Sequence, residues 1–161
     1  MKIGIDFGTT FSLPATISEN RAEVLLPRSL SGIPSVFYYD KDHGVLAGRK
    51  ADNRADINPE NAKREVKMDL NKPLSEWEFI ADGKSFTRIE IISHIFREII
   101  KNAIGVLVEK GFTSREISGA VVSVPAKFEL REKCKRAVDG EPLLNENIRK
   151  NAQKSEPRQS A

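Results

Sequence analysis

The stretch KIGIDFGTT, residues 2–10, decides how the fold begins. Its first half alternates toward a buried β-strand that ends at Asp6, and Gly8 then lets the backbone turn tightly before two threonines. Successive amides around a glycine form a concave anion site, and a carboxylate at a strand end can hold Mg²⁺, usually through water. The stretch therefore predicts a phosphate-binding turn. A plain β-hairpin turn with Asp6 in a salt bridge explains the same residues equally well.

Further strands are expected after this turn. Apolar alternation predicts strands over residues 11–18, 22–26, 35–39 and 45–47, the last two paired across a polar turn. Pro14 lies inside the second strand, where it removes a backbone donor. We therefore expect an edge position or a bulge at this proline.

The middle of the chain is polar and irregular. Between residues 49 and 72 we expect one helix before the Asn58-Pro59 breaker and a short element after it. The segments 77–80 and 84–86 then flank an Ala-Asp-Gly turn, which is typical of a β-hairpin.

The clearest element is a helix that begins at the capping box of residues 87–90 and ends at Gly111. Its apolar residues cover more than one face, so we expect it to pack between layers. Residues 120–124 predict a buried central strand, followed by a helix over 129–138. We expect residues 141–161 to be disordered or loosely helical, because few of them can add to a core.

Composition limits the possible functions. The chain has 161 residues, the size of one domain, with 26 basic and 23 acidic residues and a net charge of +3. No block of five or more basic residues occurs, which argues against a nucleic-acid partner. Apolar runs are shorter than the roughly 18 residues of a membrane span. Asp6 interrupts the apolar N-terminal region that a secretory signal peptide would need. A lone cysteine, Cys134, excludes an internal disulfide, so we expect a cytoplasmic protein without a membrane partner.

Several segments resemble one protein family. Residues 6–10, DFGTT, resemble the first phosphate motif of the actin/Hsp70/sugar-kinase ATPases. Further segments in the family's order narrow the resemblance to the Hsp70 (DnaK-like) chaperones over about residues 2–140. They are IPSV at 33–36, NPEN at 58–61 with Lys67 six positions beyond Asn61, GKSF at 83–86, and VSVPAKF at 122–128. An actin-like filament protein would share the turn but would not explain the spacing to Lys67.

This resemblance implies an α/β fold and a set of site residues. The expected fold is a ribonuclease-H-like (actin-like ATPase) first lobe with a mixed sheet over residues 1–140, carrying a smaller α+β insertion over about 32–110. The implied cofactors are ATP or ADP and Mg²⁺, with Asp6 on the magnesium side. Gly8, Thr9 and Thr10 would hold the β- and γ-phosphates, and Lys67 would be the catalytic lysine. Phe11 stands where the family has Asn or Tyr, so only its backbone amide could contribute.

The sequence also departs from the family. The second phosphate motif, the adenosine motif and the peptide-binding domain have no counterpart in these 161 residues. We therefore expect the first lobe of a chaperone ATPase, with weak or absent nucleotide affinity and no turnover by itself. Client proteins and co-chaperones would be partners of the full-length parent. The alternative is a protein-interaction module without nucleotide turnover, which docks another protein or a second copy through its exposed inter-lobe face.

Overall fold

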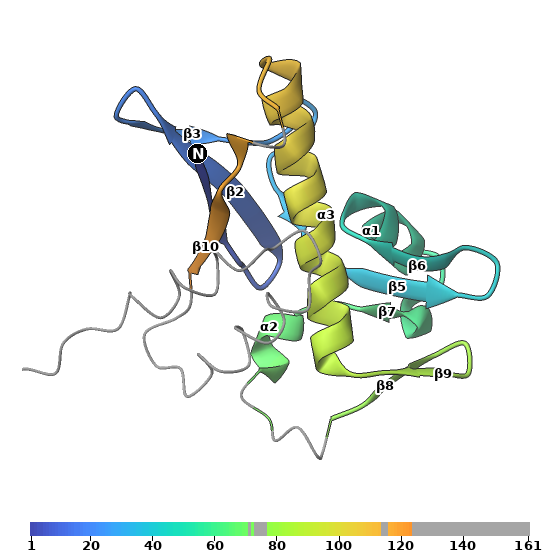
Figure 1. The fold of residues 1–161 in the computed structure, drawn as a ribbon. Coiled ribbons are helices and arrows are strands. Elements are labelled where there is room, and N and C mark those ends of the chain that lie inside the picture. The colour runs from blue at the N-terminus through green and yellow to red at the C-terminus, as the bar shows by residue number, and fades with distance from the viewer. Residues whose placement is uncertain (71, 73–76, 114–115, 124–161) are drawn as a thin grey trace, which may run out of the picture.

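A long helix separates two sheets in this molecule. The computed structural model describes residues 1–70, 72, 77–113 and 116–123. Figure 1 shows α3 (Arg88–Glu109) standing between the sheet that contains β1 and the smaller sheet that contains β5. The predicted α/β class with a mixed sheet is confirmed.

The N-terminal sheet carries the turn for which the sequence predicts phosphate binding. Its strand order is β10-β1-β2-β3, and β4 pairs with the start of β2. Only the β1–β10 pair is parallel among the described strands; the others are antiparallel. The strands are β1 (Lys2–Asp6), β2 (Phe11–Ser18), β3 (Arg21–Val24), β4 (Ile33–Pro34) and β10 (Gly119–Ser123). The strand predicted over residues 22–26 is observed as Arg21–Val24, and the strand predicted over 35–39 is observed as Phe37–Asp40.

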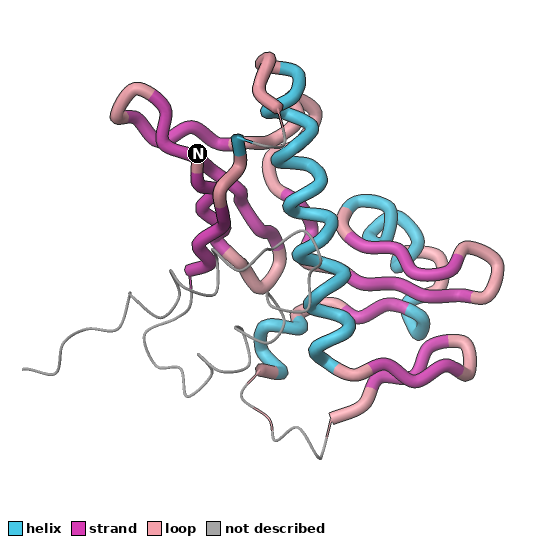
Figure 2. Tube along the Cα trace, in the orientation of Figure 1, coloured by secondary structure: helices cyan, strands magenta, loops and turns pink. Residues whose placement is uncertain are grey.

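The segment between β4 and α3 forms small sheets and short helices (Figure 2). One sheet has the order β6-β5-β7, and β8 pairs with β9 in the predicted hairpin. A helix before Asn58 and a short element after Pro59 are both present, as expected. The elements are β5 (Phe37–Asp40), β6 (Gly44–Ala47), α1 (Arg49–Ala55), η1 (Pro59–Asn61), β7 (Ala62–Lys63), α2 (Val66–Asp69), β8 (Phe79–Ala81) and β9 (Lys84–Phe86).

The helix α3 begins at the predicted capping box. Thr87 Oγ1 accepts from the Glu90 amide, while the Glu90 carboxylate accepts from the Thr87 amide. Eleven of its 22 residues are buried, including Ile91, Ile95 and Ile99. They pack against Ile3, Ile5 and Phe7 on one side and against Phe37 and Phe86 on the other. This two-sided burial confirms that the helix packs between layers.

The expectation of an edge position or a bulge at Pro14 is wrong, because its strand is interior and its pairing with β1 keeps an unbroken register. Its strand, β2, lies between β1 and β3. The Pro14 carbonyl accepts a hydrogen bond from the Leu25 amide at 2.8 Å, one residue beyond the end of β3. In an antiparallel pair, two opposite residues often exchange two backbone hydrogen bonds, and a proline can only accept one of them because it has no N–H. The bond that Pro14 cannot donate would go to Leu25, which lies beyond the end of β3. An interior strand can tolerate proline at that position.

Some expectations fall outside the described residues. The helix expected over 129–138, the tail 141–161 and the end of the VSVPAKF segment all lie there. Among the helices that the structure describes, none is long and apolar enough to cross a membrane.

Candidate functional site

The turn between β1 and β2 is anchored by a buried ring and closed by a glycine. Phe7 is buried, and its ring centroid lies 5.0 Å from that of Phe96 on α3. A Cβ placed on Gly8 would lie 1.9 Å from the Phe11 carbonyl oxygen. Gly8 has no left-handed φ, so glycine is required here by close backbone approach. Any side chain would push the two arms of the turn apart.

Asp6 lies on the sheet face opposite α3. Its side chain is exposed, and Oδ1 accepts a hydrogen bond from Ser123 Oγ at 2.7 Å. Asp6 pairs with Leu13 on β2 and with Ser123 on β10, and all three are exposed. Ser123 was not among the expected site residues, because its place beside Asp6 depends on the β1–β10 pairing. An oriented, exposed carboxylate is therefore available at the end of β1.

The two threonines leave donors free in the turn. Thr10 is exposed and Thr9 is partly exposed, and within the described residues neither amide donates a hydrogen bond. The Gly8 amide, by contrast, donates to Ser12 Oγ at 3.3 Å. The Thr10 carbonyl accepts from the Ser35 amide at 2.8 Å. The amides of Thr9 and Thr10 are thus the turn donors available to an anion.

Phe11 begins β2 with its side chain half exposed. The ring packs over Gly32: a Cβ added at Gly32 would lie 3.0 Å from the Phe11 Cβ. The aromatic side chain therefore has a packing role at the edge of the turn, and only its backbone could contact a phosphate.

Lys67 is brought to the turn from the short helix α2. Its ammonium Nζ donates to the Phe7 carbonyl oxygen at 2.5 Å, across 60 residues of sequence. The helix α2 begins after Glu65, which has a left-handed φ of 55°. Met68, which follows Lys67 in this helix, is 61% exposed. The local reversal at Glu65 lets Val66 enter the core while Lys67 reaches the turn. The structure thus brings the Lys67 ammonium into contact with the turn that follows β1.

Comparison with known proteins shows the family to which this fold belongs. A family model described as "Hsp70 protein" matches residues 2–139. The chain belongs to the Hsp70 family. The matched stretch corresponds to the N-terminal ATPase region of Hsp70 proteins, so the resemblance drawn from the motifs is confirmed.

Curated Hsp70 relatives are similar over most of the chain. The chaperone protein DnaK of Cenarchaeum symbiosum is 31% identical over 132 residues, which cover 79% of this chain and 19% of that protein. The DnaK of Cyanidioschyzon merolae is 32% identical over 149 residues, covering 78% and 23%. The HscA homolog of Pasteurella multocida is 30% identical over 145 residues, covering 80% and 23%. The chain therefore spans about a fifth of the length of these relatives.

Charged side chains gather around the buried Asp69 at the end of α2 in this Hsp70 region. The Asp69 carboxylate forms ion pairs with Lys63 at 2.5 Å and with Lys72 at 2.7 Å. Burial alone would raise the pKa of Asp69, but hydrogen bonds from Lys63, Lys72 and Trp77 outweigh it and lower the pKa to about 2. The buried guanidinium of Arg88 donates to the backbone carbonyls of Asp69 and Lys72. No sequence motif predicts this cluster, because its residues come together only when α2 packs on α3.

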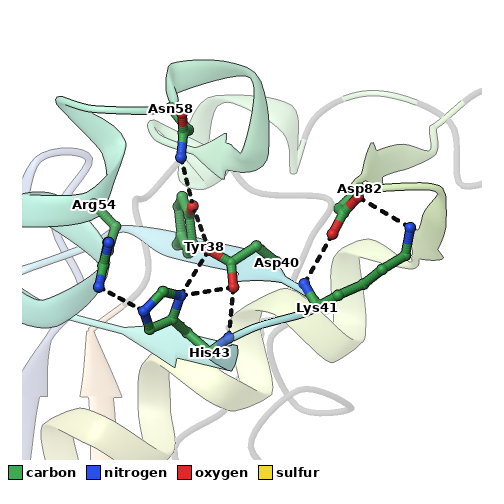
Figure 3. Close-up of polar contacts among 7 residues, drawn as sticks. All are labelled: Tyr38, Asp40, Lys41, His43, Arg54, Asn58 and Asp82. Carbon is green, nitrogen blue, oxygen red and sulfur yellow. Dashed lines mark hydrogen bonds and ion pairs between the residues drawn. The ribbon is translucent and has the colours of Figure 1, made fainter.

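A second polar cluster links β5, the turn that follows it and α1 (Figure 3). The Asp40 carboxylate accepts from the Tyr38 hydroxyl and from the backbone and ring of His43. The other ring nitrogen of His43 faces Arg54 at 2.5 Å. Burial would raise the Asp40 pKa, but the hydrogen bonds from Tyr38 and His43 lower it to about 2. The described residues contain no group of three or more His, Cys, Asp or Glu side chains that could hold a metal ion.

Proposed function

We propose that this chain is the first lobe of an Hsp70-like chaperone ATPase, which carries the first phosphate-binding motif and the catalytic lysine for Mg-ATP. The observation that carries the proposal is the hydrogen bond between Lys67 and the Phe7 carbonyl, because it joins the two motifs at one place. Phosphoryl transfer needs placement and positive charge more than covalent chemistry from the protein. A donor turn beside an ammonium supplies both.

The donors of the turn fit a polyphosphate. Thr9 and Thr10 offer two accessible amides and two hydroxyls, which suit phosphate oxygens. Asp6 is exposed and is oriented by Ser123, which suits a magnesium ion held by one carboxylate, waters and phosphate oxygens. When bound, Mg²⁺ would neutralise charge on the phosphates. Gly8 and Phe11 would contribute backbone shape rather than side-chain donors.

Lys67 has hydrogen-bond donors beyond the one that the Phe7 carbonyl occupies. An ammonium has three donors, and the Phe7 carbonyl occupies one of them. The remaining donors can bind a phosphate oxygen and position a water for attack. The fixed carbonyl contact would limit the motion of the lysine and so reduce the entropy cost of that arrangement.

In this chain alone, we expect weak binding of ATP or ADP and no turnover. The described residues supply phosphate donors on one side only, so most of the nucleotide would stay in water, where each hydrogen bond contributes less. In a full-length parent, hydrolysis would gate the binding of client proteins with the help of co-chaperones. The single cysteine is consistent with a cytoplasmic location.

Isotope-labelled NMR with Mg-ATP at millimolar concentration tests this proposal. We expect amide shifts confined to residues 6–11 and to α2, with a dissociation constant in the millimolar range. Calorimetry that gave a micromolar constant would contradict the first-lobe reading, and shifts that avoided the turn would contradict the site. The Lys67→Met variant should lose most of the response, whereas Lys101→Met, on the exposed side of α3, should keep it.

A second candidate function is protein interaction without nucleotide turnover. The sheet face opposite α3 carries exposed apolar side chains, with Ile17 at 75%, Val121 at 54% and Val24 at 51% exposure. Val121, Gly4, Ala15 and Val24 lie side by side across four strands. Such a face can dock another protein or a second copy. Light scattering, which measures the molar mass in solution, distinguishes the two candidates. A tight dimer that the Ile17→Lys variant dissociates would favour the interaction module.

A further inference from the structure

Two buried serines lie directly beneath the turn and contact it from β2 and from the segment after β4. Ser12 and Ser35 are 0% and 1% exposed, and their hydroxyl oxygens lie 2.9 Å apart. Ser12 Oγ accepts the hydrogen bond from the Gly8 amide, and the Ser35 amide donates to the Thr10 carbonyl. The pair thus holds the turn at both of its ends.

From these contacts we infer that Ser12 and Ser35 are positioning residues that select which turn amides face the phosphate. The Gly8 amide is tied inward to Ser12, so it is not a phosphate donor. Between Gly8 and the start of β2, the donors that remain are the amides and hydroxyls of Thr9 and Thr10. This inference rests on the proposed nucleotide function for its ligand, although the hydrogen bonds stand without it.

The physical reason lies in the burial of the pair. A buried hydroxyl must find a partner within the protein, because water is excluded. Ser12 satisfies this need with Gly8 and Ser35 at the same time, so the turn and the 33–35 segment are locked to one geometry. A turn fixed before binding loses less conformational freedom when the anion arrives. The same lock keeps Gly8 close to the Phe11 carbonyl, where no Cβ would fit.

Hydrogen exchange of the full chain tests the lock without any ligand. In the wild-type protein the Gly8 amide should exchange more slowly than the amides of Thr9 and Thr10. Ser12→Ala should speed Gly8 exchange roughly three- to tenfold, the change expected for loss of one hydrogen bond. Thr16→Val is the matched control, because Thr16 is a buried hydroxyl on the same strand that bonds to the Lys2 carbonyl instead.

Titration with magnesium tripolyphosphate then tests the choice of donors. Thr9 and Thr10 amides should shift in the wild-type chain while Gly8 does not, and Ser12→Ala should make Gly8 respond as well. Ser35→Ala keeps the backbone contact to Thr10 and removes only the partner of the Ser12 hydroxyl, so the Thr9 and Thr10 shifts should persist while Gly8 exchange speeds up less than in Ser12→Ala.

Three results would overturn the inference. They are Gly8 exchange as fast as that of the threonines in the wild type, equal effects of Ser12→Ala and Thr16→Val, or a wild-type Gly8 shift as large as that of Thr9. If tripolyphosphate shifts no amide, the proposed phosphate site and the donor assignment both fail. The exchange comparison still decides whether Ser12 holds Gly8.

Discussion

The Lys67 ammonium donates a hydrogen bond to the Phe7 carbonyl at 2.5 Å, although 60 residues separate the two in sequence. Phe7 directly follows β1 and packs its buried ring against Phe96, and Lys67 projects from α2. The contact therefore couples the position of the lysine to the first peptide of the turn that follows β1. Movement of α2 would move the ammonium relative to the amides of the turn.

Replacing Lys67 with methionine should destabilise the chain by about 1.5 kcal/mol. A hydrogen bond from a charged group contributes more than a neutral one, and this contact is partly buried. The measurement is the midpoint of urea unfolding, compared with Lys101→Met, which alters an exposed lysine of α3. Equal midpoints for the two variants would show that the Phe7 contact contributes nothing to stability.

Gly8→Ala should destabilise the chain by about 2 kcal/mol or more. The added Cβ would lie 1.9 Å from a backbone oxygen, so the turn itself must distort. Gly105→Ala is the matched control, because it lies on the exposed side of α3 with nothing within 4 Å. That change should stabilise by up to about 1 kcal/mol, since glycine costs helix stability. A Gly8→Ala protein as stable as the wild type would contradict the close approach.

Asp69 should make the stability pH-dependent in acid. Its pKa falls from 3.8 to about 2 in the folded chain, so its contribution is complete above about pH 4 and is lost as the pH falls through 2. The contribution is about 2 kcal/mol. Asp69→Asn should be less stable at pH 7, and its deficit against the wild type should shrink between pH 4 and pH 2.

Urea unfolding over that pH range gives the measurement, and Asp42→Asn provides the control. Asp42 is exposed in the turn between β5 and β6, so its variant should track the wild type at every pH. A constant deficit for Asp69→Asn down to pH 2 would mean that the carboxylate is not held by its lysines.

The two histidines should adopt opposite neutral tautomers. Arginine only donates hydrogen bonds, so Nε2 of His43 accepts from Arg54 and its Nδ1 carries the proton toward Asp40 (Figure 3). In His94 it is Nδ1 that accepts from Arg97, at 2.9 Å, which leaves the proton on Nε2. Burial, and then the Arg97 charge, lower the pKa of His94, so it should stay neutral to a lower pH than a free histidine.

Nitrogen NMR of the imidazole rings at pH 7.5 distinguishes the tautomers directly. The Asp40→Ala, Arg54→Met double variant should allow His43 to sample both tautomers, because either contact alone keeps the proton on Nδ1, and it should leave the His94 spectrum unchanged. Identical tautomers in the wild-type protein would contradict one of the two arginine contacts.

Local sequence patterns predicted the elements that depend on local chemistry. Alternation gave β1 and β2, the capping box at Thr87 gave the start of α3, and the Asp-Gly turn gave the β8–β9 hairpin. Pro14 misled the prediction, because the place where β3 ends cannot be known from β2 itself. Ser123, Asp69 and Arg88 were not expected at the site, since their partners are distant in sequence.

The sequence by itself determined that a glycine turn follows the first strand, that a two-sided helix comes later, and that the motifs keep the order of one family. Periodicity and capping act over a few residues, so they can be recognised in a linear chain. Only the tertiary structure decided that Lys67 contacts Phe7, that Ser12 removes the Gly8 amide from the donor set, and that a buried Asp69 holds α2. These contacts form when distant segments bury apolar surface together, and no local pattern records which polar groups will then meet.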